Sequence, residues 1–183
     1  MSRIPAAADL VGTDLPDLTF RFREGMRWVD RTTADLFAGN RVVAFALPGA
    51  FTPTCSTKHV PRFDELASEF RDVGIDALIV VSVNDAFVMK AWEADQGTTE
   101  VTYLPDGNGA LTEALGMLVD KRDLGFGMRS WRYAMVVDDG RVEAAFIEPD
   151  VPGDPFGVSD ADTVLTALGG TPTPSRLPDA CAL

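Results

Sequence analysis

The sequence lacks any apolar run long enough to cross a membrane as a helix, which takes about 18 consecutive residues. Its densest apolar stretch, residues 42–47, stops at Pro48 and Gly49. Arg3 lies near the amino end, but neither the apolar run nor the cleavage site of an export signal follows it. From these absences we expect a cytoplasmic protein with no membrane partner.

Cysteine and histidine are scarce: the chain has two cysteines, Cys55 and Cys181, and one histidine, His59. A secreted domain held together by disulfides has more cysteines in a shorter chain. A structural zinc site needs four clustered ligands, so we expect no metal, and nothing in the sequence indicates another cofactor. The two thiols are therefore either inert buried side chains or reactive nucleophiles, and composition does not decide between them.

Basic residues are also few, since 16 Lys and Arg stand against 28 Asp and Glu and give a formal net charge of −12. They are scattered, with no run longer than Lys121-Arg122. Binding to nucleic acid or to an anionic membrane depends on clustered positive charge that releases counterions. We therefore expect neither partner, and we interpret the acidity as a solvated surface that keeps the protein soluble.

The sequence does contain enough apolar residues for one core, at 46% of its 183 residues. Residues 19–30 alternate in polarity around a turn at Glu24-Gly25, which predicts an N-terminal β-hairpin. Apolar strands then alternate with helices, a pattern typical of an α/β protein with a central mixed sheet sandwiched by helices, and a thioredoxin-like fold is the obvious member of that class. The predicted strands are residues 41–47, 77–83, 101–104, 131–138 and 141–147. One predicted helix follows the Pro48-Gly49 turn and runs through residues 60–70, and the other predicted helices are residues 35–38, 85–94, 110–116 and 160–168.

The two ends of the chain lack such periodicity. Residues 1–16 predict an extended arm at the start of a domain that spans residues 1–170. Residues 171–183 are rich in Thr, Pro and Ser and predict a flexible tail, in which Cys181 is exposed.

Cys55 follows a predicted strand and a Pro-Gly turn, in the first turn of the next helix. Unpaired amides and the helix dipole at such an end favour thiolate over thiol, and they lower a cysteine pKa from about 8.5 to about 3.5–7.5. The alternative is a small buried apolar side chain, which free cysteine often is. Thr52, three residues earlier, is either the cap of this helix or a hydrogen-bonding group above its end, and spacing alone favours neither.

The residues around Cys55 resemble the sequence signature of a known protein family. Pro48, Thr52 and Cys55 match the Pro-x-x-x-Thr-x-x-Cys signature of peroxiredoxins, and the run from Pro48 to Ser56 with His59 and Pro61 resembles the type-II, peroxiredoxin-five-like subfamily. The likeness covers residues 15–168, and three blocks in the right order make it specific. The other two blocks are residues 81–89 with Trp92, and residues 132–137.

The resemblance implies a thiol peroxidase for hydrogen peroxide and alkyl hydroperoxides. Cys55 would attack a peroxide oxygen and become a sulfenic acid. Arg132 would hold the sulfur ionised and bind the peroxide, Thr52 would also bind it, and Pro48 would shield the sulfur. Without the resemblance, the sequence would predict Arg132 to be a surface charge on a strand. Arg129 lies close to it in the sequence but precedes the block that matches the family.

His59 lies four residues after Cys55, and a Cys–His pair can act as a nucleophile with a general base. Four residues along a helix move the imidazole about 6 Å from the helix end, however, and not over the sulfur. We therefore expect a structural or supporting role for His59 rather than direct catalysis.

The sulfenic acid must be reduced, and some type-II relatives have a second cysteine for this where this chain has Val80 and Ser159. Residues 154–163 resemble a bacterial branch that uses glutathione, so we expect glutathione with glutaredoxin in trans as the reductant. The alternatives are Cys181 as a resolving thiol with thioredoxin, and a peroxide sensor whose oxidation alters a partner interface. The family also implies a homodimer.

Overall fold

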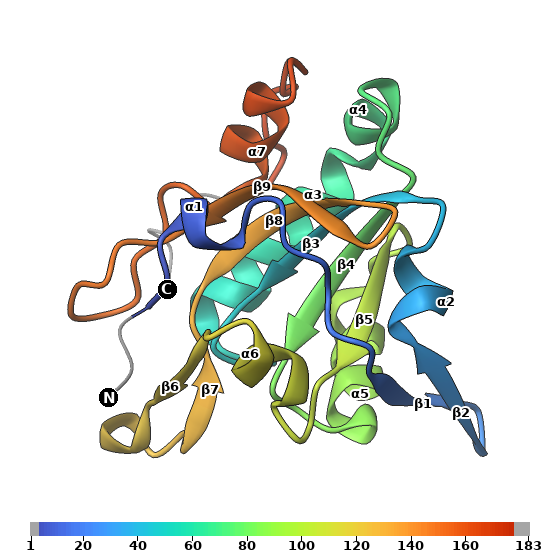
Figure 1. Cartoon of the computed structure of the whole chain (residues 1–183), viewed down its shortest axis with the longest axis vertical. Helices are drawn as coiled ribbons and strands as arrows, with labels where there is room; N and C mark the ends of the chain where they lie inside the picture. The colour runs from blue at the N-terminus through green and yellow to red at the C-terminus, as the bar shows by residue number, and fades with distance from the viewer. Residues whose placement is uncertain (1–3, 178–183) are drawn as a thin grey trace.

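The computed structural model of the chain describes residues 4–177 and has a five-stranded mixed sheet at its centre (Figure 1). The strand order is β5-β4-β3-β8-β9. The parallel strands are β3 (Arg41–Ala46), β4 (Ala77–Ser82) and β5 (Val101–Pro105), and the antiparallel ones are β8 (Tyr133–Asp138) and β9 (Arg141–Ile147). The predicted mixed sheet is therefore confirmed.

Apolar residues fill both faces of this sheet because its central strands are apolar at nearly every position. Along β3, Val43 and Phe45 point into one cluster, and Val42 and Ala44 into the other. The first cluster lies under α3 (Val60–Glu65), α4 (Ala67–Asp72), α5 (Ala86–Gln96) and α7 (Ala161–Ala167). The second lies under α1 (Ala7–Leu10), α2 (Thr33–Phe37) and α6 (Ala110–Ala114).

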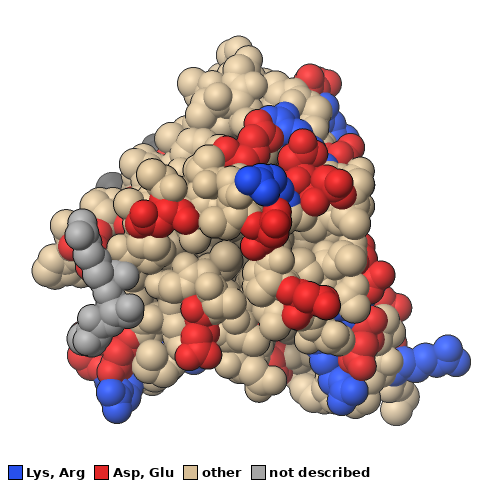
Figure 2. All heavy atoms as spheres, viewed as in Figure 1, with Lys and Arg blue, Asp and Glu red and all other residues tan. Residues whose placement is uncertain are grey.

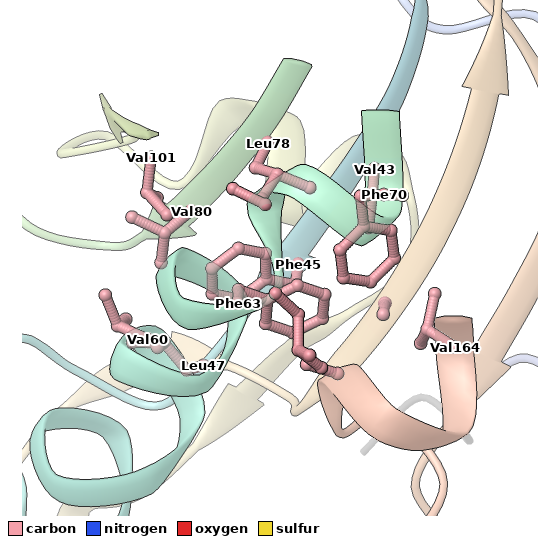
Figure 3. Packing of buried hydrophobic residues seen from close by; sticks show 14 of the residues in the cluster. Val43, Phe45, Leu47, Val60, Phe63, Phe70, Leu78, Val80, Val101 and Val164 are labelled. Atoms are coloured by element: carbon pink, nitrogen blue, oxygen red, sulfur yellow. The ribbon is translucent and has the colours of Figure 1, made fainter. Parts of the chain in front are cut away.

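Aromatic stacking joins the first layer of helices to the sheet (Figure 3). The rings of Phe45 on β3 and Phe63 on α3 stack with centroids 4.0 Å apart, and Phe70 on α4 continues the stack at 5.5 Å from Phe63. Buried aromatic pairs of this kind add about 0.5–1.5 kcal/mol each beyond the area they bury. They fix α3, and with it the segment before α3 that holds Cys55, against the sheet.

The predicted N-terminal hairpin is also confirmed. Strands β1 (Thr19–Glu24) and β2 (Arg27–Thr32) pair antiparallel, and Gly25 at the turn has a φ of +58°, which glycine adopts without strain. Acidic side chains are dispersed over the face of the molecule shown in Figure 2, with basic side chains among them and along its lower edge. Several charged side chains form ion pairs, such as Arg41 with Glu143.

Three parts of the chain differ from the sequence prediction. The arm expected to be extended contains the single helical turn α1, which buries Leu10. The predicted helix over residues 60–70 is divided at Leu66, whose ψ of 11° interrupts the regular hydrogen bonding. A small hairpin of β6 (Leu118–Asp120) and β7 (Met128–Ser130) was not predicted, because each strand has only three residues, too few to show a period.

The start of the predicted tail contacts the domain. The carbonyl of Thr173 accepts from Arg62, and Glu65 accepts from the Arg176 amide and the Ser175 hydroxyl. The division of the chain at residue 170 stays a prediction, and Cys181 lies outside the described residues. None of the helices within residues 4–177 is long and apolar enough to span a membrane.

Candidate active site

The loop after β3 presents Cys55 at the start of a helix, as the sequence predicts. The helix begins at Pro53, and the amide of Ser56 donates to the Thr52 carbonyl at 3.0 Å. Cys55 opens a π-helical turn, Cys55–His59, in which the Val60 amide donates to the Cys55 carbonyl five residues back. Such turns are rare and concentrate at functional sites. The Cys55 side chain is fully buried.

A second loop, at the end of β4, holds this segment in place. The Asn84 side-chain oxygen accepts from the Ala50 amide at 3.0 Å and from the Ser82 hydroxyl at 2.7 Å. Parallel strands β3 and β4 end at the same edge of the sheet, which brings these loops together. Phe51, with a φ of 60°, takes the left-handed conformation in the middle of the first loop, a strained geometry for a bulky residue.

Arg132 directly precedes β8, and its side chain reaches the Cys55 sulfur. Its Nη1 and Nη2 atoms each lie 3.6 Å from Cys55 Sγ. Only 1% of Arg132 is exposed, so it is not the surface charge that the strand alone would suggest. Burial lowers the Arg132 pKa, but the neighbouring Cys55 and Asp154 outweigh burial and raise it, so the guanidinium stays charged.

All five N–H groups of the Arg132 guanidinium have acceptors. Two point to Cys55, one donates to His59 Nδ1 at 3.0 Å, and Nε and Nη2 donate to Asp154 at 3.2 Å and 2.6 Å. Phe156 covers one face of the group, with its ring centroid 5.3 Å from the guanidinium carbon. A planar fork held on three sides is rigid, and lysine cannot reproduce it.

His59 supports Arg132 rather than Cys55. Because an arginine only donates, His59 Nδ1 must accept, and Nε2 therefore carries the proton that it donates to the Ser159 carbonyl at 3.1 Å. The imidazole is fully buried, and burial together with the Arg132 charge lowers its pKa to about 3. Its one lone pair is thus taken by Arg132, which leaves none to act as a general base toward the thiol.

This neutral histidine makes stability depend on pH. Unfolded His59 takes up a proton below about pH 6.5, whereas the folded side chain resists it down to about 3. The unfolded state binds more protons in this window, so the free energy of unfolding falls as pH falls, by up to about 3 kcal/mol between pH 6.5 and pH 4. Urea unfolding across this range measures the slope.

The assignment is clean because the chain has one histidine. In His59→Asn, whose amide oxygen still accepts from Arg132, the slope between pH 6.5 and about 4.5 should flatten, whatever the absolute stability. A slope equal to that of the unsubstituted protein would contradict the buried neutral imidazole.

Thr52 and Pro48 lie in the loop that leads to Cys55. The Thr52 hydroxyl donates to the Gly49 carbonyl at 2.9 Å, and among the described residues no helix amide donates to it. Its proton is therefore engaged, and its lone pairs are open to a donor. Pro48 is buried. Arg129, the other arginine nearby, donates to the Val83 carbonyl at 2.6 Å and makes no hydrogen bond to Cys55.

Sequence reasoning missed the loop between β9 and α7. This loop contributes Asp154 and Phe156 to the Arg132 environment and the Ser159 carbonyl to His59. Nothing local distinguishes Asp154 from the many other acidic residues of the chain. The only available signal was the clustering of Asp154 and Phe156 in the segment that resembles the glutathione-using branch.

A thioredoxin-like sheet that presents a buried cysteine at a helix start, with an arginine fork on its sulfur, defines a thiol-based oxidoreductase. The sequence matches the Redoxin family over residues 10–165. It is 56% identical to the hybrid peroxiredoxin hyPrx5 of Haemophilus influenzae over 161 residues, which cover 88% of this chain and 67% of that one. It is 55% identical to peroxiredoxin sll1621 of Synechocystis, over 81% of this chain and 80% of that one.

Among solved structures, reduced Prx3 of Vibrio vulnificus in complex with hydrogen peroxide superposes with a TM-score of 0.81 at 44% identity, covering 87% of this chain and 95% of that one. The chain belongs to the peroxiredoxin family, in its type-II, peroxiredoxin-five-like subfamily. It is a thiol peroxidase in which Cys55 is the buried peroxidatic cysteine.

Proposed function

We propose that the protein reduces hydrogen peroxide and alkyl hydroperoxides at Cys55, with Arg132 and Thr52 as the groups that bind the peroxide. The placement of both Arg132 Nη atoms 3.6 Å from Cys55 Sγ, in a buried site, carries this proposal. The thiolate attacks one peroxide oxygen, the O–O bond breaks, and its electron pair leaves with the distal oxygen as water or alcohol after protonation. The sulfur is oxidised to sulfenic acid and the peroxide is reduced.

Each neighbour has a part in this step. Fixed N–H donors of Arg132 meet the negative charge that develops on the oxygens, which is worth most in a site that excludes water. Thr52 already donates to Gly49, so its oxygen is free to accept the O–H of the incoming hydroperoxide. Pro48, buried at the end of β3, keeps water from the sulfur.

We propose glutathione, with glutaredoxin in trans, as the reductant. A glutathione thiolate attacks the sulfenic sulfur and releases water, and a second thiol, delivered through glutaredoxin, then releases Cys55 from the mixed disulfide. Cys55 is the one cysteine among residues 4–177, and the positions used for a second cysteine in some relatives hold Val80 and Ser159. Glutathione as reductant implies a reducing compartment such as the cytoplasm.

Cys181→Ser tests this reductant against an internal one. We expect unchanged turnover with glutathione and glutaredoxin, and intact mass after one oxidation cycle with glutathione should show one glutathione on Cys55. If the substitution instead abolishes turnover with thioredoxin, and the oxidised unsubstituted chain contains a Cys55–Cys181 disulfide, the protein is a two-cysteine peroxidase and the glutathione proposal is wrong.

We also propose a homodimer, as the family resemblance implies. Two exposed aromatic side chains support an apolar contact: Phe51 in the Cys55 loop is 52% exposed and Phe87 at the start of α5 is 59% exposed. Burying such side chains in a shared interface removes apolar area from water. Sedimentation velocity of the reduced protein measures this state, and a monomer at micromolar concentration would contradict it.

A further inference from the structure

A buried carboxylate that the peroxidase step does not use lies at the end of β9. Only 2% of Glu148 is exposed. One of its oxygens, Oε1, accepts from three consecutive amides, those of Gly157, Val158 and Ser159, each at 2.9 Å, and from the Ser159 hydroxyl at 2.8 Å. Burial raises the Glu148 pKa, but these hydrogen bonds outweigh burial and hold the pKa below its usual value, so the group is an anion.

The segment anchored by Glu148 is held largely by side-chain contacts. It follows β9, precedes α7 and contains neither helix nor strand. A loop without a hydrogen-bond ladder keeps one conformation only if side chains satisfy its amides. Glu148 does this for three amides in a row, and it is tied to the sheet itself, since its own amide donates to the Arg132 carbonyl at 3.2 Å.

The same segment supplies groups that orient the Arg132 guanidinium, two of them directly and one through His59. Asp154 accepts from Nε and Nη2, and Phe156 lies on the guanidinium face and 4.9 Å from the His59 ring. The Ser159 carbonyl fixes the His59 tautomer that accepts from Nη1. Loss of the Glu148 anchor would therefore loosen the contacts of the guanidinium with Asp154, His59 and Phe156, although none of these residues is itself substituted.

We propose that Glu148 is a positioning residue for peroxide reduction, which acts through residues 154–159 to hold Arg132 against Cys55. The inference rests on the proposed role of Arg132 in catalysis. Glu148 touches neither the sulfur nor the guanidinium; it fixes the loop that does. A displacement of the fork by about 1 Å lowers a rate by about 100-fold when the reaction depends on that geometry.

The test pairs Glu148→Gln with a matched control. Asp106 is likewise a buried carboxylate, 3% exposed, that accepts from two consecutive amides and a hydroxyl, those of Leu111 and Thr112. It anchors α6 and makes no hydrogen bond to Cys55, His59 or Arg132 within the described residues. Asp106→Asn therefore reports the effect of weakening a buried anchor away from the site.

We expect Glu148→Gln to lower kcat/KM for hydrogen peroxide by about tenfold and Glu148→Ala by about 100-fold. The thiolate absorbance of Cys55 at neutral pH should fall in the same order, and both readouts should stay at the unsubstituted level in Asp106→Asn. Circular dichroism checks that each variant is folded. If Glu148→Ala is not folded, the rate and thiolate absorbance of Glu148→Gln alone test the proposal.

A Glu148→Gln protein with unchanged rate and thiolate absorbance would overturn the proposal, as would equal losses in Asp106→Asn. The absorbance readout needs no turnover. An unsubstituted protein that consumes no peroxide would therefore contradict the proposed function, while the effect of Glu148 on the thiolate would still be measured.

Discussion

Cys55→Ser is expected to abolish peroxide consumption, with a loss of at least about 10³-fold on the scale seen when a catalytic nucleophile is removed. A serine hydroxyl is not ionised at neutral pH and forms no sulfenic acid, so neither the attack nor the redox change can occur. The measurement that isolates this step uses no reductant. The reduced protein is mixed with a slight excess of hydrogen peroxide, and the peroxide consumed per chain is counted.

The unsubstituted protein should consume one equivalent rapidly, and Cys55→Ser none. Cys181→Ser is the matched control, because it removes the only other thiol and should still consume one equivalent at the same rate. Serine is close to cysteine in size, so the buried position should keep its packing, and thermal unfolding followed by circular dichroism checks this. Rapid consumption by Cys55→Ser, or an unsubstituted rate no faster than that of free cysteine, would contradict the assignment of the nucleophile.

The central sheet was predictable because its strands satisfy one strong local rule. Where both faces are covered, nearly every position is apolar, and residues 41–47 and 77–83 show this with Arg41 and Ser82 as the exceptions. Turn chemistry fixed the two hairpins in the same way, with Gly25 and Gly140 at positive φ. The β6–β7 hairpin and α1 could not be predicted, since elements of three or four residues contain too few side chains to show a period.

The residues of the site also differ in how far local sequence predicts them. Cys55 was found from local order alone, because a strand, a turn and a helix start place it where a thiolate is favoured. Arg132 lies 77 positions away and meets the sulfur only through the fold, so the family resemblance and not its spacing identified it. The expected supporting role of His59 agrees with the structure, since its imidazole hydrogen-bonds to Arg132 and not to the thiol, but only the fold shows that Arg132 is the residue it supports.

Glu148 had no signal in the sequence. Its role depends on three amides that converge on one carboxylate oxygen, and backbone groups carry no residue identity that a pattern could show. Asp154 is similarly hidden, because one acidic residue in a loop of a chain with 28 acidic residues reads as a surface charge. The residues that support the site could therefore be identified only from the three-dimensional structure and not from the sequence.

Arg132→Ala should lower kcat/KM for hydrogen peroxide by about 10²–10³-fold, the scale for removing a preorganised donor that meets developing negative charge. The variant removes both N–H groups that face Cys55 Sγ and leaves Asp154 and His59 without their shared partner. Arg132→Lys should recover little of the loss. One ammonium cannot face the sulfur along two bonds and also reach Asp154, because it lacks the planar fork.

Two arginines serve as controls. Arg129→Ala removes the neighbour that bonds to the Val83 carbonyl and should leave the rate within about twofold. Arg62 is also largely buried and pairs with Glu65 and Asp162, so Arg62→Ala should lower the thermal midpoint while Cys55 still reacts at its usual rate. A loss of rate in Arg62→Ala equal to that in Arg132→Ala would assign the effect to general destabilisation and not to the sulfur contact.

The pH profile of Arg132→Ala separates the two roles assigned to this arginine. If Arg132 only kept the sulfur ionised, the variant would recover the unsubstituted rate at alkaline pH, where any free thiol is a thiolate. We expect the thiolate absorbance to recover there but the rate to stay well below the unsubstituted level, because the guanidinium also stabilises the oxygens as the O–O bond breaks. Full recovery of the rate would restrict Arg132 to ionising the thiol, and a deficit that persists once Cys55 is fully ionised measures its share in the transition state.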